Sequence, residues 1–127
     1  MKNVKIITVL VLDQDAAIAF YTRKLGFELR EDKPFGESRW VTISLPKNSD
    51  LTIALELAKT AEDKAIVGKQ SGSHAFLALD TSDCIGDYKR MKPLGVKFLG
   101  EPQAGPWGTG VQFEDLYGNK FFLSQEP

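Results

Sequence analysis

The chain has 127 residues, of which 43% are hydrophobic, and this length suits one compact domain with a core of its own. Its 16 Lys and Arg residues nearly balance its 17 Asp and Glu residues, so no strong electrostatic field favours nucleic acid or an anionic membrane as a partner. The one cysteine, Cys84, excludes an intramolecular disulfide and an all-thiolate zinc site. Small molecules or other protein chains are therefore the expected partners.

The N-terminal segment has only a superficial likeness to a secretory signal. Lys2 and Lys5 precede an apolar run at residues 6–12, but Asp13 and Asp15 end this run too early for a signal peptide. No other stretch is long and apolar enough to span a membrane. We expect a cytoplasmic protein.

The first 57 residues predict a strand, a helix and three more strands. The β-branched and aliphatic run 6–12 predicts a strand, Asp13 is a suitable N-cap, and residues 16–21 supply helix formers. We expect Gly26 to end the helix at C′, where a left-handed backbone costs glycine least. The other strands are predicted at 27–31, 39–45 and 51–57, with turns at 34–36 and 46–50.

The same order of elements returns after a polar connector at residues 58–72, which holds a predicted helical turn at 62–67. Ser82 is the expected N-cap of a second helix, which runs through Met91. Strands are predicted at 74–80, 97–99, 110–114 and 120–124. A shift of about 68 positions lays Ile6 on His74 and Phe20 on Tyr88. The simplest account is a single α+β domain built from two tandem βαβββ half-modules, at about 1–57 and 73–127.

Alternation along the predicted strands separates an apolar face, expected to pack under the helices, from a mixed face. The mixed face is either the solvated side of an open sheet or the lining of a cleft. Large aromatic side chains on this face favour a cleft. Trp107 lies in the glycine-rich segment 104–110, which is predicted to be a loop that precedes a strand. Both tryptophans are either core residues or flat platforms for an aromatic ligand. The expected ligand-binding residues are Ile6, Trp40, Phe76, Trp107, Gln112 and Phe122.

Two segments of the chain carry a family resemblance. The opening segment, with Val9 to Asp13, then Phe20-Tyr21, then Leu25-Gly26-Phe27, resembles the opening signature of the vicinal-oxygen-chelate superfamily. The closing segment 114–122 is similar to the superfamily's closing signature, with Leu116 in place of a proline. This superfamily includes glyoxalases, bleomycin-resistance proteins and dioxygenases. The resemblance implies mixed sheets that curl around a cleft.

The resemblance also implies up to four metal-ligand positions, which map to Ile6, Glu56, His74 and Phe122. Ile6 and Phe122 carry no donor atom, whereas a catalytic divalent cation ordinarily needs about three protein ligands. We therefore expect no metal and no other cofactor. Glu56 and His74 remain candidate catalytic residues, because a carboxylate and an imidazole in one cleft can exchange a proton. Their plainer roles are a solvated strand end for Glu56 and a hydrogen-bonded structural residue for His74.

Two functions follow from the resemblance. The first is metal-independent binding of a planar or hydrophobic small molecule in an aromatic-lined cleft, as in the bleomycin-resistance branch. The second is a glyoxalase-like lyase or isomerase, or another enzyme of small substrates, that uses Glu56 and His74. We also expect a homodimer, because the mixed face carries more apolar area than a monomer usually exposes.

Overall fold

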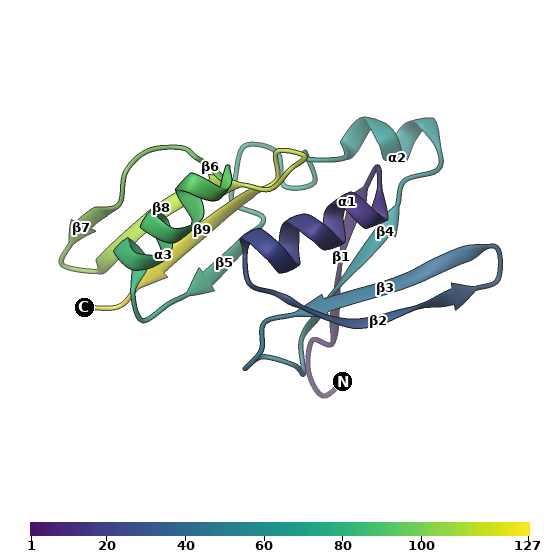
Figure 1. Cartoon of the computed structure of the whole chain (residues 1–127), viewed down its shortest axis with the longest axis horizontal. Coiled ribbons are helices and arrows are strands. Elements are labelled where there is room, and N and C mark those ends of the chain that lie inside the picture. Colours follow the sequence, from purple (N-terminus) through teal and green to yellow (C-terminus); the bar gives the residue numbers. More distant parts are fainter. The chain divides into compact units, whose positions relative to one another are not determined.

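The computed structural model describes all 127 residues and divides them into two compact units, residues 1–67 and 68–127. Each unit consists of a mixed β-sheet with helices beside it (Figure 1). The boundary between the units falls inside the connector predicted at 58–72. The α+β class predicted from the sequence is confirmed.

The first unit forms a four-stranded sheet in the order β1-β4-β3-β2, in which β1 and β4 are parallel and the other pairs antiparallel. The helix α1 packs against β4 (Figure 1). The elements are β1 (Ile6–Val11), α1 (Gln14–Ala19), a π-helical turn (Phe20–Lys24), β2 (Glu28–Phe35), β3 (Ser38–Ser44), β4 (Thr52–Leu57) and α2 (Ala61–Ile66).

The second unit repeats this plan with a sheet in the order β5-β9-β8-β6, in which β5 and β9 are parallel. A short additional strand, β7, pairs with the other end of β8, and α3 packs against β8 and β9. The elements are β5 (Leu77–Asp80), α3 (Cys84–Met91), a 3₁₀ turn (Lys92–Leu94), β6 (Lys97–Phe98), β7 (Gln103–Gly105), β8 (Gly108–Glu114) and β9 (Lys120–Gln125).

The strand registers of the two units match. In the first unit Leu10 lies opposite Glu56, and in the second Ala78 lies opposite Phe122. Ala78 is 68 positions after Leu10, the shift that aligns the two halves of the sequence. The position of Glu56 in the first sheet thus corresponds to that of Phe122 in the second.

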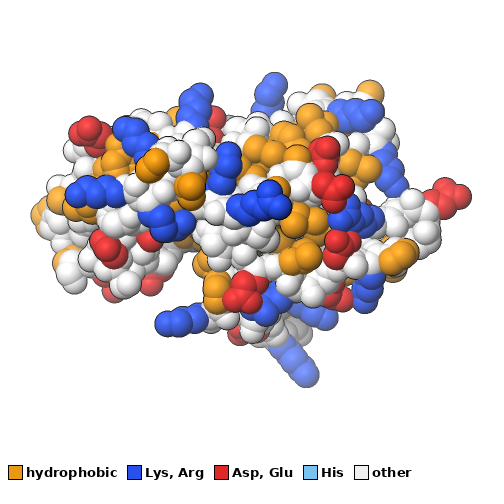
Figure 2. Space-filling model, in the orientation of Figure 1, with side chains coloured by type: hydrophobic (Ala, Val, Ile, Leu, Met, Phe, Trp, Pro, Cys, Tyr) orange, Lys and Arg blue, Asp and Glu red, His pale blue; other side chains and the backbone are white.

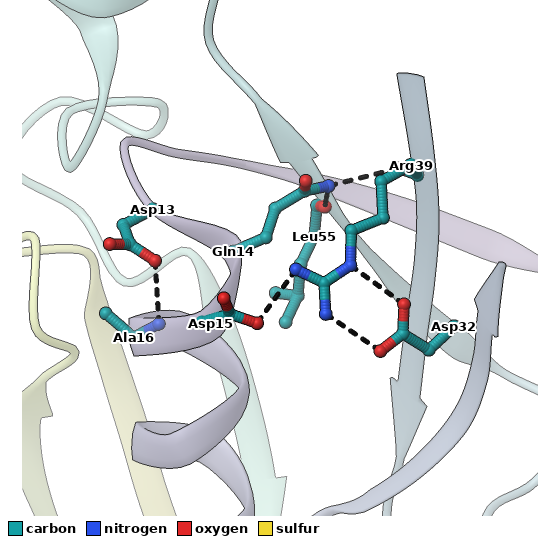
Figure 3. Close-up of polar contacts among 7 residues, drawn as sticks. All are labelled: Asp13, Gln14, Asp15, Ala16, Asp32, Arg39 and Leu55. Carbon is teal, nitrogen blue, oxygen red and sulfur yellow. Dashed lines mark hydrogen bonds and ion pairs between the residues drawn. The ribbon is translucent and has the colours of Figure 1, made fainter. Parts of the chain in front are cut away.

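The limits of the first helix follow the sequence prediction. The Asp13 carboxylate accepts a hydrogen bond of 2.9 Å from the backbone N–H of Ala16, as an N-cap does (Figure 3). Gly26 has a φ of +82°, the left-handed conformation expected of a C′ glycine. The apolar face is also confirmed at its centre, where the side chains of Val9, Ile43 and Leu55 are fully buried.

Four predicted boundaries are wrong. The N-cap of α3 is Asp83, not Ser82, because the Asp83 carboxylate accepts the N–H of Gly86. The predicted turn at 34–36 is largely strand, since β2 is an edge strand, where Pro34 need not donate to a partner. The strand predicted from His74 begins at Leu77. The segment before β8, predicted as a loop, contains β7.

Candidate functional site

The sheet of the second unit carries an open cavity of about 380 Å³. Its wall combines aliphatic, aromatic and amide side chains with one glycine on a central strand. The residues that define its shape are Leu99, Gln103, Trp107, Gly110, Gln112 and Phe122. Three of the six predicted ligand-binding residues, Trp107, Gln112 and Phe122, therefore lie in one cavity.

Strand pairing places these residues together. Gln112 of β8 lies directly opposite Phe122 of β9, and Gln103 of β7 lies opposite Gly110. The backbone N–H of Leu99 donates to the carbonyl of Gln112 at 2.9 Å, which holds the segment after β6 beside β8. The cavity is thus built on four neighbouring segments of one sheet: β7, β8, β9 and the segment after β6.

The turn between β8 and β9 fixes this register. The Asp115 carboxylate accepts the backbone N–H groups of Tyr117 and Asn119, each at 2.9 Å, and the Asn119 side-chain amide at the same distance. Both Asp115 and Asn119 are buried. The closing signature of the sequence therefore has a structural role, since it sets the alignment of Gln112 with Phe122.

An aromatic pair forms one wall of the cavity. The ring centroids of Trp107 and Phe122 are 6.2 Å apart, and the ring planes are tilted by 43°. Trp107 remains 53% exposed, so its indole is not a core residue. An exposed indole beside a phenyl ring offers a flat apolar surface to a second ring system.

Polar groups at this cavity are amides and one carboxylate. Gln103 and Gln112 are exposed, and each amide can both donate and accept hydrogen bonds. The Gln103 side chain donates to the carbonyl of Glu101 at 3.3 Å. Glu101 is the one ionisable residue in the cavity wall.

Trp40 lies in the first unit, on the mixed face of its sheet. Its indole N–H donates to the Glu31 carboxylate at 3.2 Å, and its ring lies 6.5 Å from that of Phe35. Lys33 contacts the same carboxylate at 2.9 Å. The hydrogen bond from Lys33 is the main cause that lowers the pKa of Glu31, and the bond from Trp40 acts in the same direction. Trp40 is therefore an aromatic residue at the surface, and a hydrogen bond to Glu31 holds its indole in place.

Ile6 and Phe76, the other two predicted ligand-binding residues, do not line the cavity. Ile6 is on the edge strand β1, opposite Thr52, and is partly exposed. Phe76 lies just before β5, and its ring packs 6.5 Å from that of Phe121.

Glu56 lines a smaller polar pocket of about 170 Å³ in the first unit, together with Arg39 and Lys59. Gln14, which is buried, also lines this pocket, and its side-chain amide donates to the carbonyls of Arg39 at 3.1 Å and Leu55 at 2.9 Å (Figure 3). Gln14 therefore ties α1 to both β3 and β4 beside Glu56.

Arg39 is an ion-pair residue. Its guanidinium contacts Asp32 on β2 and Asp15 in the first turn of α1, each at 2.8 Å (Figure 3). Hydrogen bonding to Asp32, and then to Asp15, raises the pKa of Arg39 above its ordinary range. The Arg39 guanidinium is thus already engaged by carboxylates of its own unit.

His74 is exposed in the turn that precedes β5. No three His, Cys, Asp or Glu side chains are grouped so that they could hold a metal ion. Of the four positions that the resemblance maps as metal ligands, Ile6 and Phe122 offer no donor atom. The residues present do not fit a catalytic divalent cation.

Sequence reasoning missed Gln103 and Gly110 as cavity residues. Gln103 belongs to β7, which was expected to be loop. Gly110 was placed at the start of a strand, and a glycine within a strand is a known sign of close approach by another group. That signal was available in the sequence.

Basic and acidic side chains alternate over the visible face of the protein, with apolar groups between them (Figure 2). This agrees with the near-neutral charge balance of the sequence. None of the helices has both the length and the apolar character that a transmembrane span requires.

The topology and the cavity define a small α+β protein with a ligand-sized hollow on one sheet. The family model described as the glyoxalase/bleomycin resistance protein/dioxygenase superfamily matches residues 4–123, and the chain belongs to this superfamily. A protein from Shewanella frigidimarina is 42% identical over 121 residues, which cover 94% of this chain and 90% of that protein.

Two solved structures are similar along their whole length. UcmS2 has a TM-score of 0.86 and 32% identity, with 98% of both chains covered. TnmS3, an antibiotic-binding protein from Streptomyces sp. CB03234, has a TM-score of 0.78 and 31% identity, with 100% of this chain and 98% of that chain covered.

Proposed function

We propose that this protein binds a flat, largely apolar small molecule in the cavity of the second unit, and that it needs no metal ion to do so. The observation that carries the proposal is the aromatic wall of Trp107 and Phe122 in a cavity of about 380 Å³. This volume is within the range of about 300–1,000 Å³ that is typical of small-molecule sites.

The chemistry of the wall supports a flat ligand. Stacking on an aromatic side chain contributes about 0.5–1.5 kcal/mol beyond the burial of apolar area. The neighbouring amides of Gln103 and Gln112 can pair with polar atoms at the edge of such a ligand, whichever of donor or acceptor it presents. The wall therefore suits an aromatic ring system with carbonyl, hydroxyl or amino groups at its rim.

The similar proteins support the same class of function. TnmS3 is described as an antibiotic-binding protein, and its likeness to this chain extends over the whole domain. Binding of a small organic molecule by this chain would be a function of the same class.

Metal independence is supported by the residues at the mapped ligand positions. Phe122, which corresponds in register to Glu56, is part of the aromatic wall. An apolar ring at that position contributes to ligand stacking and cannot coordinate a cation. Glu56 belongs to the first unit and His74 to the second, and the polar pocket beside Glu56 is lined by residues of the first unit.

We also propose that the protein acts as a cytoplasmic homodimer. The aromatic residue Phe35, which is 68% exposed and lies outside the cavity, supports pairing of two chains. Cys84 is fully buried, and burial raises the pKa of its thiol, so it is poorly suited to an intermolecular disulfide. Pairing would thus be noncovalent.

The test is a thermal-shift screen on protein dialysed against a chelator, with rigid tricyclic compounds and flexible compounds of equal size. A ligand present at about 100 times its Kd stabilises the folded state by about 2.7 kcal/mol, which a melting curve detects. We expect the rigid tricyclic compounds to raise Tm without added metal, and Zn²⁺ or Ni²⁺ to leave the shift unchanged. A shift that appears only with metal, or no shift with any compound, would contradict the proposal.

A further inference from the structure

We infer that Gly110 determines which ligands the cavity accepts, because only a residue without a side chain lets the rings of Trp107 and Phe122 meet over β8. The inference rests on the proposed binding function and adds a specificity-determining residue to it. It also narrows the ligand to a rigid, flat ring system that lies against one side of the aromatic pair.

The space above Gly110 is filled by both rings. A Cβ atom added at Gly110 would lie 2.6 Å from Cζ of Phe122 and 2.9 Å from Cη2 of Trp107. Carbon atoms in contact are ordinarily about 3.5–4.0 Å apart, so even a methyl group would displace both rings. Gly110 does not have a positive φ, and its backbone conformation is therefore open to any residue. Space, and not backbone conformation, requires glycine here.

Gly105, on the neighbouring strand β7, also leaves space for an aromatic ring. A Cβ atom at Gly105 would lie 2.7 Å from Nε1 of Trp107 and would meet no atom of Phe122 among its nearest neighbours. The indole of Trp107 thus rests on the backbones of two glycines, one on β7 and one on β8. Alanine at Gly105 would move one ring, whereas alanine at Gly110 would move both.

The geometry of the pair limits how a ligand can bind. A ring inserted between two parallel rings needs about 7 Å between their planes, twice the ordinary carbon contact distance of about 3.5 Å. The centroids of Trp107 and Phe122 are only 6.2 Å apart and the rings are tilted by 43°. A ligand must therefore lie against the open side of the pair. A rigid flat ligand needs both rings in their present positions, whereas a flexible one adjusts to displaced rings.

The test uses Trp40→Phe as the background protein. The sequence has two tryptophans, so this substitution leaves Trp107 as the only one, and its fluorescence reports binding. The probes are anthraquinone-2-sulfonate, which is rigid and flat, and 4-benzylbenzenesulfonate, which has the same charge but a flexible joint. We compare this background with the same protein carrying Gly110→Ala or Gly105→Ala. Circular dichroism and denaturant unfolding check that each variant folds.

For Gly110→Ala we expect the affinity for the flat probe to fall about tenfold relative to that for the flexible probe, since the stacking contacts of two rings are lost. Gly105→Ala should reduce the same ratio by a smaller factor, because it moves only Trp107. If Gly110→Ala fails to fold, the Gly105→Ala ratio decides the question. An unchanged ratio in the folded variants would overturn the inference alone. A background protein that binds neither probe would overturn the proposed function as well.

Discussion

The Arg39 guanidinium donates two hydrogen bonds of 2.8 Å to the Asp32 carboxylate, from Nε to Oδ1 and from Nη2 to Oδ2. The two residues lie on neighbouring strands, β3 and β2, and the same guanidinium reaches Asp15 on α1. A planar guanidinium fits a carboxylate in this two-bond arrangement better than an ammonium group does. The contact joins the helix to the outer edge of the first sheet.

This ion pair predicts a pH dependence of stability. The hydrogen bonds from Arg39 lower the pKa of Asp32 in the folded protein. A lowered folded-state pKa stabilises the fold above the pKa of an unfolded aspartate, about 3.9, and this stabilisation is lost as the pH falls through the folded value. Both side chains are about one-third exposed, so the contribution at neutral pH should be at most about 1 kcal/mol.

The test compares Asp32→Asn with the unchanged protein by urea unfolding at pH 7 and at progressively lower pH. We expect the variant to be less stable at pH 7, and the difference to shrink as the pH falls below the aspartate range. Asp50→Asn is the control, because Asp50 is exposed in a turn and forms no ion pair with a lysine or arginine. A difference for Asp32→Asn that stays constant with pH would show that the ion pair is not its source.

A substitution at Gly26 tests whether a left-handed glycine ends the first helical segment. Its φ is +82°, and a Cβ atom added there would meet nothing within 4 Å. Any cost of substitution must therefore come from the backbone conformation. We expect Gly26→Val to lower the free energy of unfolding by about 1 kcal/mol or more, because β-branched residues rarely adopt this conformation. The measurement is the denaturant midpoint, with Gly26→Asn as a matched variant that should cost less. Equal midpoints for all three proteins would contradict this placement.

The sequence predicted the elements whose local signals agree with one another. Asp13 and Gly26 mark the two ends of a helical segment, and both were found where the pattern placed them. Strand alternation placed Gln112 and Phe122 on the mixed face, and both line the cavity of the second unit together with Trp107. These features depend on capping, backbone conformation and period-two alternation, which are all local properties.

The features that were missed depend on contacts between distant segments. The strand β7 is only three residues long and exists because β8 offers it a partner. The strand β2 can continue through Pro34 because it lies at the edge of its sheet, and the local sequence does not reveal which strands are edge strands. The need for glycine at position 110 arises only because the register of β8 and β9 brings the rings of Trp107 and Phe122 over it.

The proposed dimer predicts a measurable mass in solution. Two-fold pairing would cover apolar residues that the single chain leaves exposed, among them Phe35. We expect sedimentation equilibrium at micromolar concentration to give twice the mass of the chain. Phe35→Ser should shift the equilibrium toward the monomer, whereas Lys47→Ser, also at an exposed position of the first unit, should not. A monomer across the whole concentration range would contradict the pairing.

The central claim, that the cavity of the second unit binds a flat ligand at Trp107, is tested most directly by the fluorescence of the two single-tryptophan variants. Trp40→Phe leaves Trp107 as the reporter, and Trp107→Phe leaves Trp40. In metal-free buffer, titration with anthraquinone-2-sulfonate should quench Trp107 with a saturating curve. The probe should bind about two- to tenfold more weakly to Trp107→Phe, because stacking on the indole contributes about 0.5–1.5 kcal/mol. Saturable quenching of Trp40 with undiminished affinity in Trp107→Phe, or no saturable quenching of Trp107 in the other variant, would contradict the account.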